Sequence, residues 1–288
     1  MFAGKLAVSL GFTCDFKCEH CANGFEKPCS LTPAEKKSIV SVINKYKIRK
    51  LHFIGGEPTL YLRDINEIVR GINDKKNSSV VITTNGGFAK SVEKATSILK
   101  KIPLLKKVQL SYDKFHAKFM PLSGVANVHS AAINLGLEFG VLFSIQNPLD
   151  MALISELRKI GDFPIMMQKV LPQGSAATNN AAYNNHMVFD KKVLKEKCPE
   201  RNDMVYICGK GFTFCCSALV FNLKLHDAIF KNPEEMFKSA LLRQLKDNNF
   251  GALMKKHRVS SDTLMPLHSS VCNLCEHIFS TSSMARWR

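Results

Sequence analysis

The chain has 288 residues, of which 45% are hydrophobic and 22% are charged. This composition is typical of a folded globular protein and excludes a disordered or low-complexity chain. The formal net charge of +16 indicates either anionic partners or a surface of solvated lysines. No segment approaches the roughly 18 consecutive apolar residues of a membrane helix, and the first residues carry no signal segment. The sequence therefore predicts a cytoplasmic protein without membrane contact.

Short β-like runs and amphipathic helical patterns alternate over the first two-thirds of the chain. The predicted strands are 6–10, 51–54, 80–84, 108–111, 141–145 and 165–170, and helical patterns lie between them at 33–43, 65–72, 92–99, 128–135 and 151–158. A capping box from Thr32 to Glu35 begins the first helix, and Asp64 is placed to cap the second. Such alternation predicts a parallel sheet covered by crossover helices. Six units are too few for a closed eight-stranded barrel, so we expect an α/β fold with a partial (β/α)6 barrel.

The alternation stops near residue 190, which divides the chain into two predicted domains. Residues 1–190 form the partial barrel, and residues 191–288 form a small C-terminal domain with several cysteine-bearing loops. One helix is predicted over 233–241, with Asn232 as its cap. We expect metal binding to order the loops of this second domain.

Ten cysteines are many for a protein of a reducing compartment, where grouped cysteines bind metal or act in redox chemistry more often than they form disulfides. They form two groups, and none lies between residues 30 and 197. The first group is Cys14, Cys18, Cys21 and Cys29, and the second is Cys198, Cys208, Cys215, Cys216, Cys272 and Cys275.

The first group opens with a CxxxCxxC spacing directly after the first predicted strand. Cys14, Cys18 and Cys21 place three thiols on one short loop, as an iron–sulfur cluster requires of its ligands. Three protein ligands leave one iron of a four-iron cluster open, whereas a structural zinc site closes with four ligands. Zinc held with His20 or Cys29 is the alternative interpretation.

A second motif, Gly55-Gly56-Glu57-Pro58, follows the second predicted strand. Glycines let the backbone approach a ligand closely, and a glutamate can accept from an ammonium group. With the CxxxCxxC loop, this turn makes the sequence resemble the radical S-adenosylmethionine (SAM) superfamily. The resemblance implies a [4Fe–4S] cluster on the three cysteines and binding of the SAM amino group by Gly55, Gly56 and Glu57. A simple turn between strand and helix is the alternative.

Further SAM contacts are implied at the ends of later strands. Segments 83–86 and 111–113 resemble the TxNG and SxD stretches of the family, and residues after the fifth strand are candidates by position alone. The resemblance implies Thr83, Asn85, Ser111 and Asp113, and position alone adds Ser144 and Gln146. For each of them, an ordinary turn at a strand end is an equally good interpretation. The turn Pro172-Gln173-Gly174 resembles a P-x-G turn of the family.

The chain departs from the family pattern at two places. His20 precedes the third cysteine, where an aromatic residue is frequent, and Lys114-Phe115-His116 follows Asp113, where many peptide-modifying relatives have glycine. The pKa range of histidine suits proton transfer, so His116 is our candidate catalytic acid or base. A purely structural role is its alternative.

The second cysteine group resembles the short Twitch form of the SPASM auxiliary-cluster domain. The matching pattern is Cys198, a glycine at 211 and Cys216, followed by Cys272-x-x-Cys275. The resemblance implies one auxiliary [4Fe–4S] cluster on these four cysteines. Adjacent side chains of a strand point to opposite faces, so Cys215 and Cys216 are not both expected as ligands, and the spacing favours Cys216. Cys208 and Cys215 are left as buried thiols or substitute ligands, and zinc is the alternative metal.

The resemblance implies an oxidoreductase-type enzyme that reductively cleaves SAM to a 5′-deoxyadenosyl radical, which abstracts hydrogen from a substrate. We expect oxidative modification of a peptide or protein, such as a cross-link or a dehydrogenation. The alternatives are a small-molecule dehydrogenase or cyclase and, outside catalysis, an iron–sulfur electron carrier or sensor. Expected partners are the peptide or small-molecule substrate and an electron donor such as flavodoxin or ferredoxin. The sequence has no nucleic-acid-binding signature, which argues against a nucleic-acid partner.

Overall fold

The computed structural model describes residues 4–185, 187–200, 202–215 and 217–281. Its centre is one eight-stranded sheet with the order β6-β5-β4-β3-β2-β1-β7-β8. The strands are β1 (Leu6–Ser9), β2 (Lys50–Ile54), β3 (Ser79–Thr84), β4 (Leu105–Ser111), β5 (Glu138–Ile145), β6 (Ile165–Lys169), β7 (Met204–Ile207) and β8 (Gly211–Thr213). All neighbours are parallel except β7 and β8. The predicted partial barrel is confirmed, with all six predicted strands in place.

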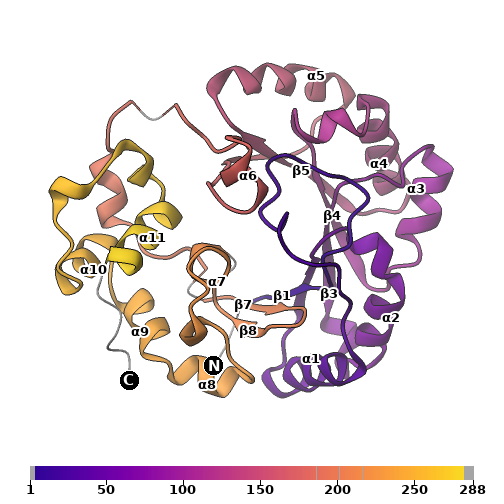
Figure 1. The fold of residues 1–288 in the computed structure, drawn as a ribbon. Helices are drawn as coiled ribbons and strands as arrows, with labels where there is room; N and C mark the ends of the chain where they lie inside the picture. The colour runs from indigo at the N-terminus through magenta and orange to yellow at the C-terminus, as the bar shows by residue number, and fades with distance from the viewer. Residues whose placement is uncertain (1–3, 186, 201, 216, 282–288) are drawn as a thin grey trace.

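Five helices cover the outer face of the curved sheet (Figure 1). They are α1 (Pro33–Tyr46), α2 (Leu62–Arg70), α3 (Val92–Leu99), α4 (Leu122–Asn134) and α5 (Ala152–Ile160). The capping box of α1 is confirmed, since the Glu35 backbone N–H donates to Thr32 Oγ1 over 3.2 Å. The predicted cap of α2 is wrong, because Tyr61 occupies the cap position without a side-chain hydrogen bond. Asp64 instead accepts from Lys36 Nζ over 2.8 Å and so links α2 to α1.

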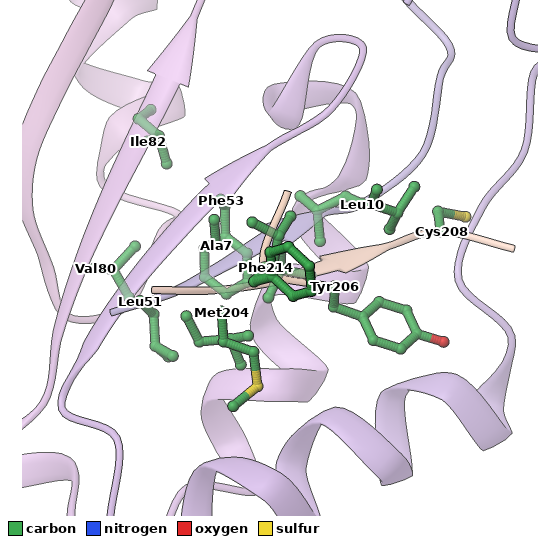
Figure 2. Close-up of a cluster of buried hydrophobic side chains, with 14 of the residues drawn as sticks. Ala7, Leu10, Leu51, Phe53, Val80, Ile82, Met204, Tyr206, Cys208 and Phe214 are labelled. Atoms are coloured by element: carbon green, nitrogen blue, oxygen red, sulfur yellow. The ribbon is translucent and has the colours of Figure 1, made fainter. Parts of the chain in front are cut away.

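The sheet crosses the domain boundary that we predicted at residue 190. Strand β7 pairs in parallel with β1, from Leu6 opposite Met204 to Ser9 opposite Ile207. Every residue of β7 is buried, and Figure 2 shows Met204 and Tyr206 in the same apolar cluster as Leu51. The sequence analysis did not identify β7 and β8, because runs of four and three residues lack a visible two-residue period.

The remaining C-terminal segment is helical and lies beside the open side of the barrel (Figure 1). Its helices are α7 (Ala218–Phe221), α8 (Pro233–Lys238), α9 (Ala240–Asp247), α10 (Phe250–Lys256) and α11 (Val271–Thr281), whereas the short helix α6 (Ser175–Thr178) follows β6. The single helix predicted over 233–241 is wrong. Ser239 has an extended backbone that ends α8, and its hydroxyl accepts from the Leu242 backbone N–H over 3.1 Å to cap α9.

Single-turn 3-10 helices fill the connections. They are η1 (Pro58–Tyr61), η2 (Lys75–Asn77), η3 (His116–Lys118), η4 (Pro148–Met151), η5 (Lys191–Lys195), η6 (His226–Ala228), η7 (Ser261–Thr263) and η8 (Pro266–Ser269). Among the described residues, no helix has the length and apolar character needed to cross a membrane.

Candidate active site

The three cysteines of the CxxxCxxC motif lie on a loop of residues 11–30, which we call the cysteine loop. It follows the carboxyl end of β1, and an isolated bridge between Gly11 and Ser30 closes its base. Burial raises the pKa of Cys14 to about 11 and also raises the pKa of Cys18 and Cys21. For Cys18, the nearby thiol of Cys21 is the next cause. Burial by itself therefore favours the neutral thiols, whereas a bound cation would stabilise the thiolate forms.

The spacing of the sulfurs tests which metal group fits. A single tetrahedral zinc ion needs thiolate sulfurs about 3.8 Å apart, because each Zn–S bond is about 2.3 Å long. Among the described residues, three possible ligand atoms come within 4.8 Å of one another only at His20, Asp113 and His116. The three sulfurs of the cysteine loop do not form such a group, so the loop is not a preassembled zinc site. Three thiols on one loop are the ligand type that an iron–sulfur cluster takes.

The Gly55-Gly56-Glu57 turn is fastened to the base of the cysteine loop. The Gly56 backbone N–H donates to the Gly11 carbonyl over 2.7 Å, and the Glu57 backbone N–H donates to the Thr13 carbonyl over 2.9 Å. A Cβ atom on Gly56 would lie 1.9 Å from the Thr13 carbonyl oxygen, and one on Gly55 (φ 141°) would lie 2.6 Å from that of Gly11. Both glycines are thus required by the contact between two loops, whatever they also contribute to SAM.

Glu57 is 1% exposed and joins the ends of β2 and β3. Its Oε1 accepts from the Thr59 backbone N–H (3.0 Å), the Thr59 hydroxyl (2.7 Å) and the Thr84 hydroxyl (2.7 Å), and its Oε2 accepts from the Asn85 backbone N–H (2.8 Å). Burial raises the pKa of Glu57, although these hydrogen bonds oppose the shift. A carboxylate has about four acceptor positions. Oε2 accepts only one of these hydrogen bonds, so it is the oxygen with acceptor capacity left.

Asn85 contacts the cysteine loop, whereas Thr83 contacts side chains of the neighbouring strands β2 and β4. The Asn85 side-chain amide donates to Asp15 Oδ1 over 2.7 Å and to Cys14 Sγ over 3.5 Å. Thr83 Oγ1 is 2.7 Å from His52 Nε2 and donates to Gln109 Oε1 over 3.3 Å. Asp15 and His52 were missed by the sequence analysis, because neither stands in a recognisable motif.

Asp113 connects β4 to the cysteine loop through two histidines. Its Oδ1 is 2.9 Å from His116 Nδ1, and its Oδ2 is 3.4 Å from His20 Nε2. Burial lowers the pKa of His20 to about 4, so the side chain is neutral at pH 7. Burial alone would raise the pKa of Asp113, but the contact with His116 reverses the shift and lowers it. His20 also stacks on Phe115 with ring centroids 4.3 Å apart.

The other predicted SAM contacts differ in how much hydrogen-bonding capacity they have left. Ser144 Oγ accepts from Gln168 Nε2 over 3.1 Å. Gln146 accepts from Lys114 Nζ over 2.7 Å and donates to the Asn180 carbonyl over 2.7 Å, so both ends of its amide are engaged within the protein. Ser111, at the end of β4, is half-buried.

The turn Pro172-Gln173-Gly174 lies against the cysteine loop and also contacts the second cysteine group. The Ser175 backbone N–H donates to the Cys21 carbonyl over 2.9 Å, and a Cβ atom on Gly174 (φ 56°) would lie 2.3 Å from the Ala22 carbonyl oxygen. On the other side, Gln173 Oε1 accepts from the Ser217 hydroxyl over 2.9 Å. The two cysteine sites therefore share one short turn.

Four cysteines of the second group gather between the end of β8 and α11. Cys198, Cys215, Cys272 and Cys275 line one cavity, together with Ser217, Phe250 and other residues. Burial, with a smaller contribution from the neighbouring Cys215, raises the pKa of Cys198 to about 12 and that of Cys272 to about 11. These sulfurs too are not within the 4.8 Å spacing of a single-ion site. The predicted ligand Cys216 lies outside the described residues, and Cys215 occupies the site.

Comparisons with known proteins agree with this site. Residues 8–132 match the family model described as Radical SAM superfamily. Over 315 aligned residues, the chain is 24% identical to the "Putative peptide biosynthesis protein YydG" of Bacillus subtilis (strain 168), covering 98% of this chain and 94% of that protein. It is 36% identical over 84 residues to a "Probable GTP 3′,8-cyclase" of Thermoplasma volcanium, covering 28% of this chain and 26% of that protein.

A solved structure shows the same fold over nearly the whole length. The structure titled "Native anSMEcpe with bound AdoMet and Cp18Cys peptide" superposes with a TM-score of 0.58 at 14% identity, covering 96% of each chain. The matched motif residues lie within 8–132, and the likeness of fold extends through the C-terminal helices. Residues 8–132 are thus a radical SAM domain and the chain is a radical SAM enzyme, a class that uses a [4Fe–4S] cluster and SAM.

Proposed function

We propose that the enzyme oxidatively modifies a peptide. The observation that carries the proposal is the similarity to the peptide biosynthesis protein YydG along 98% of the chain. That alignment spans both cysteine groups, whereas the matches to the cyclases cover between 28% and 57% of the chain. The solved structure with the same fold contains, by its title, AdoMet and a peptide.

The concave face of the sheet offers a polar floor for such a substrate. His52, Thr83 and Gln109 form a hydrogen-bonded row across β2, β3 and β4, and all three are partly exposed. Burial lowers the pKa of His52 to about 4, so the row is neutral at pH 7. Neutral donors and acceptors suit the amide groups of a peptide, because they pair with them without a buried unpaired charge.

The cluster and SAM, when bound, supply a one-electron cleavage that yields a carbon-centred radical. Cys14, Cys18 and Cys21 would hold the cluster, and the free lone pair of Glu57 Oε2 would accept from the amino group of SAM. Asn85 and Asp113 fix the cysteine loop relative to the strand ends, so the reacting groups keep their positions. His116 would act on the substrate side as acid or base only after leaving Asp113, so we assign it first a positioning function.

We further propose that Cys198, Cys215, Cys272 and Cys275 would hold an auxiliary [4Fe–4S] cluster, which would supply an electron acceptor for an oxidation of the substrate. Cys215→Ala is expected to lower the iron content by about four per chain, and Cys216→Ala is expected to leave it unchanged. Anaerobic iron and sulfide analysis of the two reconstituted variants measures this. Iron lost from Cys216→Ala and kept in Cys215→Ala would restore the ligand set that the spacing favours.

Cys272→Ala separates cleavage of SAM from the substrate reaction. Because Cys272 lies outside the cysteine loop, the variant is expected to release 5′-deoxyadenosine at a rate within about threefold of wild type, yet to form no modified peptide. Liquid chromatography of the nucleoside and mass spectrometry of the peptide give the two readouts. Normal peptide product would show that the second site is structural.

The proposed function is tested with reduced, reconstituted enzyme, SAM and a set of peptides. An oxidative product loses two hydrogens, so its mass falls by about 2 Da, and deuterium from a labelled substrate should appear in 5′-deoxyadenosine. GTP is the parallel substrate, because the partial similarity to GTP 3′,8-cyclases favours a purine nucleotide as the second candidate. Deuterium transfer from GTP and none from any peptide would overturn the proposal.

A further inference from the structure

Two cysteines outside both proposed cluster sites face each other across the sheet edge. Cys29, at the base of the cysteine loop, is half-buried, and Cys208, directly after β7, is 2% exposed. Their Sγ atoms are 3.0 Å apart. The two residues are 179 positions apart in the chain, so only the tertiary fold brings them together.

The backbone holds each cysteine in place from its own side. The Cys29 carbonyl accepts from the Tyr61 hydroxyl over 2.9 Å, and that same oxygen of Tyr61 accepts from the Thr13 backbone N–H over 2.8 Å. The Cys208 backbone N–H donates to the Ser9 carbonyl over 3.2 Å. Figure 2 shows Cys208 at the end of the strand, beyond Tyr206 and near Leu10. The sulfurs therefore meet without a rearrangement of either chain segment.

This pair does not fit a metal site. Among the described residues, no third histidine, cysteine or carboxylate brings a ligand atom within 4.8 Å of both sulfurs. The nearby Glu35 carboxylate is engaged elsewhere, because its Oε1 accepts from the Tyr206 hydroxyl over 2.9 Å and from the Gly209 backbone N–H over 2.8 Å. Two isolated thiols in contact are instead the arrangement that thiol–disulfide exchange requires, since a disulfide needs its sulfurs only about 1 Å closer.

We propose that Cys29 and Cys208 are a redox-active dithiol that a small-molecule disulfide, such as oxidised glutathione, converts to an intramolecular disulfide. The half-buried Cys29 is the attacking thiol, because Cys208 is closed to solvent. Cys29 loses its proton and attacks one sulfur of the small disulfide, which forms a mixed disulfide and releases one thiol. Cys208 then loses its proton, attacks the Cys29 sulfur and releases the second thiol. Two protein S–H bonds are exchanged for one S–S bond, and the small disulfide is reduced to two thiols.

The disulfide would tie the base of the cysteine loop to the end of β7. The base is already closed by the bridge between Gly11 and Ser30, so the link leaves the positions of the cluster ligands in place. Oxidation is therefore expected to leave the iron content unchanged. This expectation is independent of the substrate and of the proposed function.

The experiment treats reconstituted holoenzyme with oxidised glutathione without oxygen, blocks remaining thiols by alkylation, and maps them by peptide mass spectrometry. In wild type, we expect both thiols to be lost together and a Cys29–Cys208 cross-linked peptide to appear. In Cys208→Ser, a glutathione adduct should accumulate on Cys29, because the resolving thiol is missing. In Cys29→Ser, Cys208 should stay a free thiol.

Each other outcome contradicts the proposal. A stable glutathione adduct on Cys29 of wild type would show that Cys208 does not resolve it, and two persistent free thiols would show that the pair is inert. Iron lost in step with oxidation would make Cys29 a cluster ligand. Iron measured in both serine variants before oxidation confirms that the holoenzyme is intact, so the thiol map does not depend on a misfolded variant.

Discussion

Replacing Cys18 by alanine is expected to abolish SAM cleavage, with 5′-deoxyadenosine formation at least a thousandfold below wild type. Cys18 is the central cysteine of the CxxxCxxC motif, and if the three cysteines are the ligands, the two remaining thiolates cannot hold a four-iron cluster that already lacks a fourth protein ligand. The iron content of the reconstituted protein should fall from about eight to about four per chain, because the second cysteine group is untouched. Anaerobic iron analysis and a cleavage assay with dithionite measure both effects.

Cys29→Ala is the matched control, because Cys29 lies on the same loop but contacts Cys208. This variant should keep about eight irons and cleave SAM. Cleavage retained in Cys18→Ala would contradict the assignment of the cysteine loop as the cluster site. If both variants lost SAM cleavage but kept their iron, the loss would come from a disturbed base of the cysteine loop and not from a missing cluster ligand.

Glu57→Ala is expected to destabilise the protein by about 3–5 kcal/mol even without SAM, because two buried and two partly buried donors lose their acceptor. These donors belong to Thr59, Thr84 and Asn85, which form the start of η1 and the end of β3. The urea midpoint of the reconstituted protein, measured without SAM, should fall accordingly. Thr84→Val removes one of the four donors and is expected to cost about 1 kcal/mol.

Comparing Glu57→Ala with Thr84→Val distinguishes a structural function of Glu57 from a function in SAM binding alone. If the carboxylate served only to bind the amino group of SAM, Glu57→Ala would weaken SAM binding and leave the urea midpoint unchanged. A shift no larger than that of Thr84→Val would therefore contradict the structural function. Glu57 Oε2 accepts from the Asn85 backbone N–H and can accept a further hydrogen bond. We therefore expect Glu57→Ala to weaken SAM binding in addition to lowering stability.

The local pattern of the sequence was enough to predict the barrel and the cluster loop. The six predicted strands and five helices of the first two-thirds recur in the structure, because hydrophobic periodicity and helix caps are local signals. Cys14, Cys18 and Cys21 stand within eight residues, so their spacing alone keeps them on one loop. The capping box at Thr32 is equally local.

Residues that meet across long sequence separations were decided by the tertiary structure. Strand β7 pairs with β1 through backbone hydrogen bonds between distant segments of the chain. The four-residue sequence of β7 does not reveal this pairing. Likewise, Cys215 lines the second cysteine site, although the spacing along the chain favoured the adjacent Cys216. The reason is physical: sequence fixes side-chain chemistry and local conformation, whereas contact between distant residues depends on how the completed sheet places its strand ends. The meeting of Cys29 with Cys208 over 3.0 Å is the clearest instance.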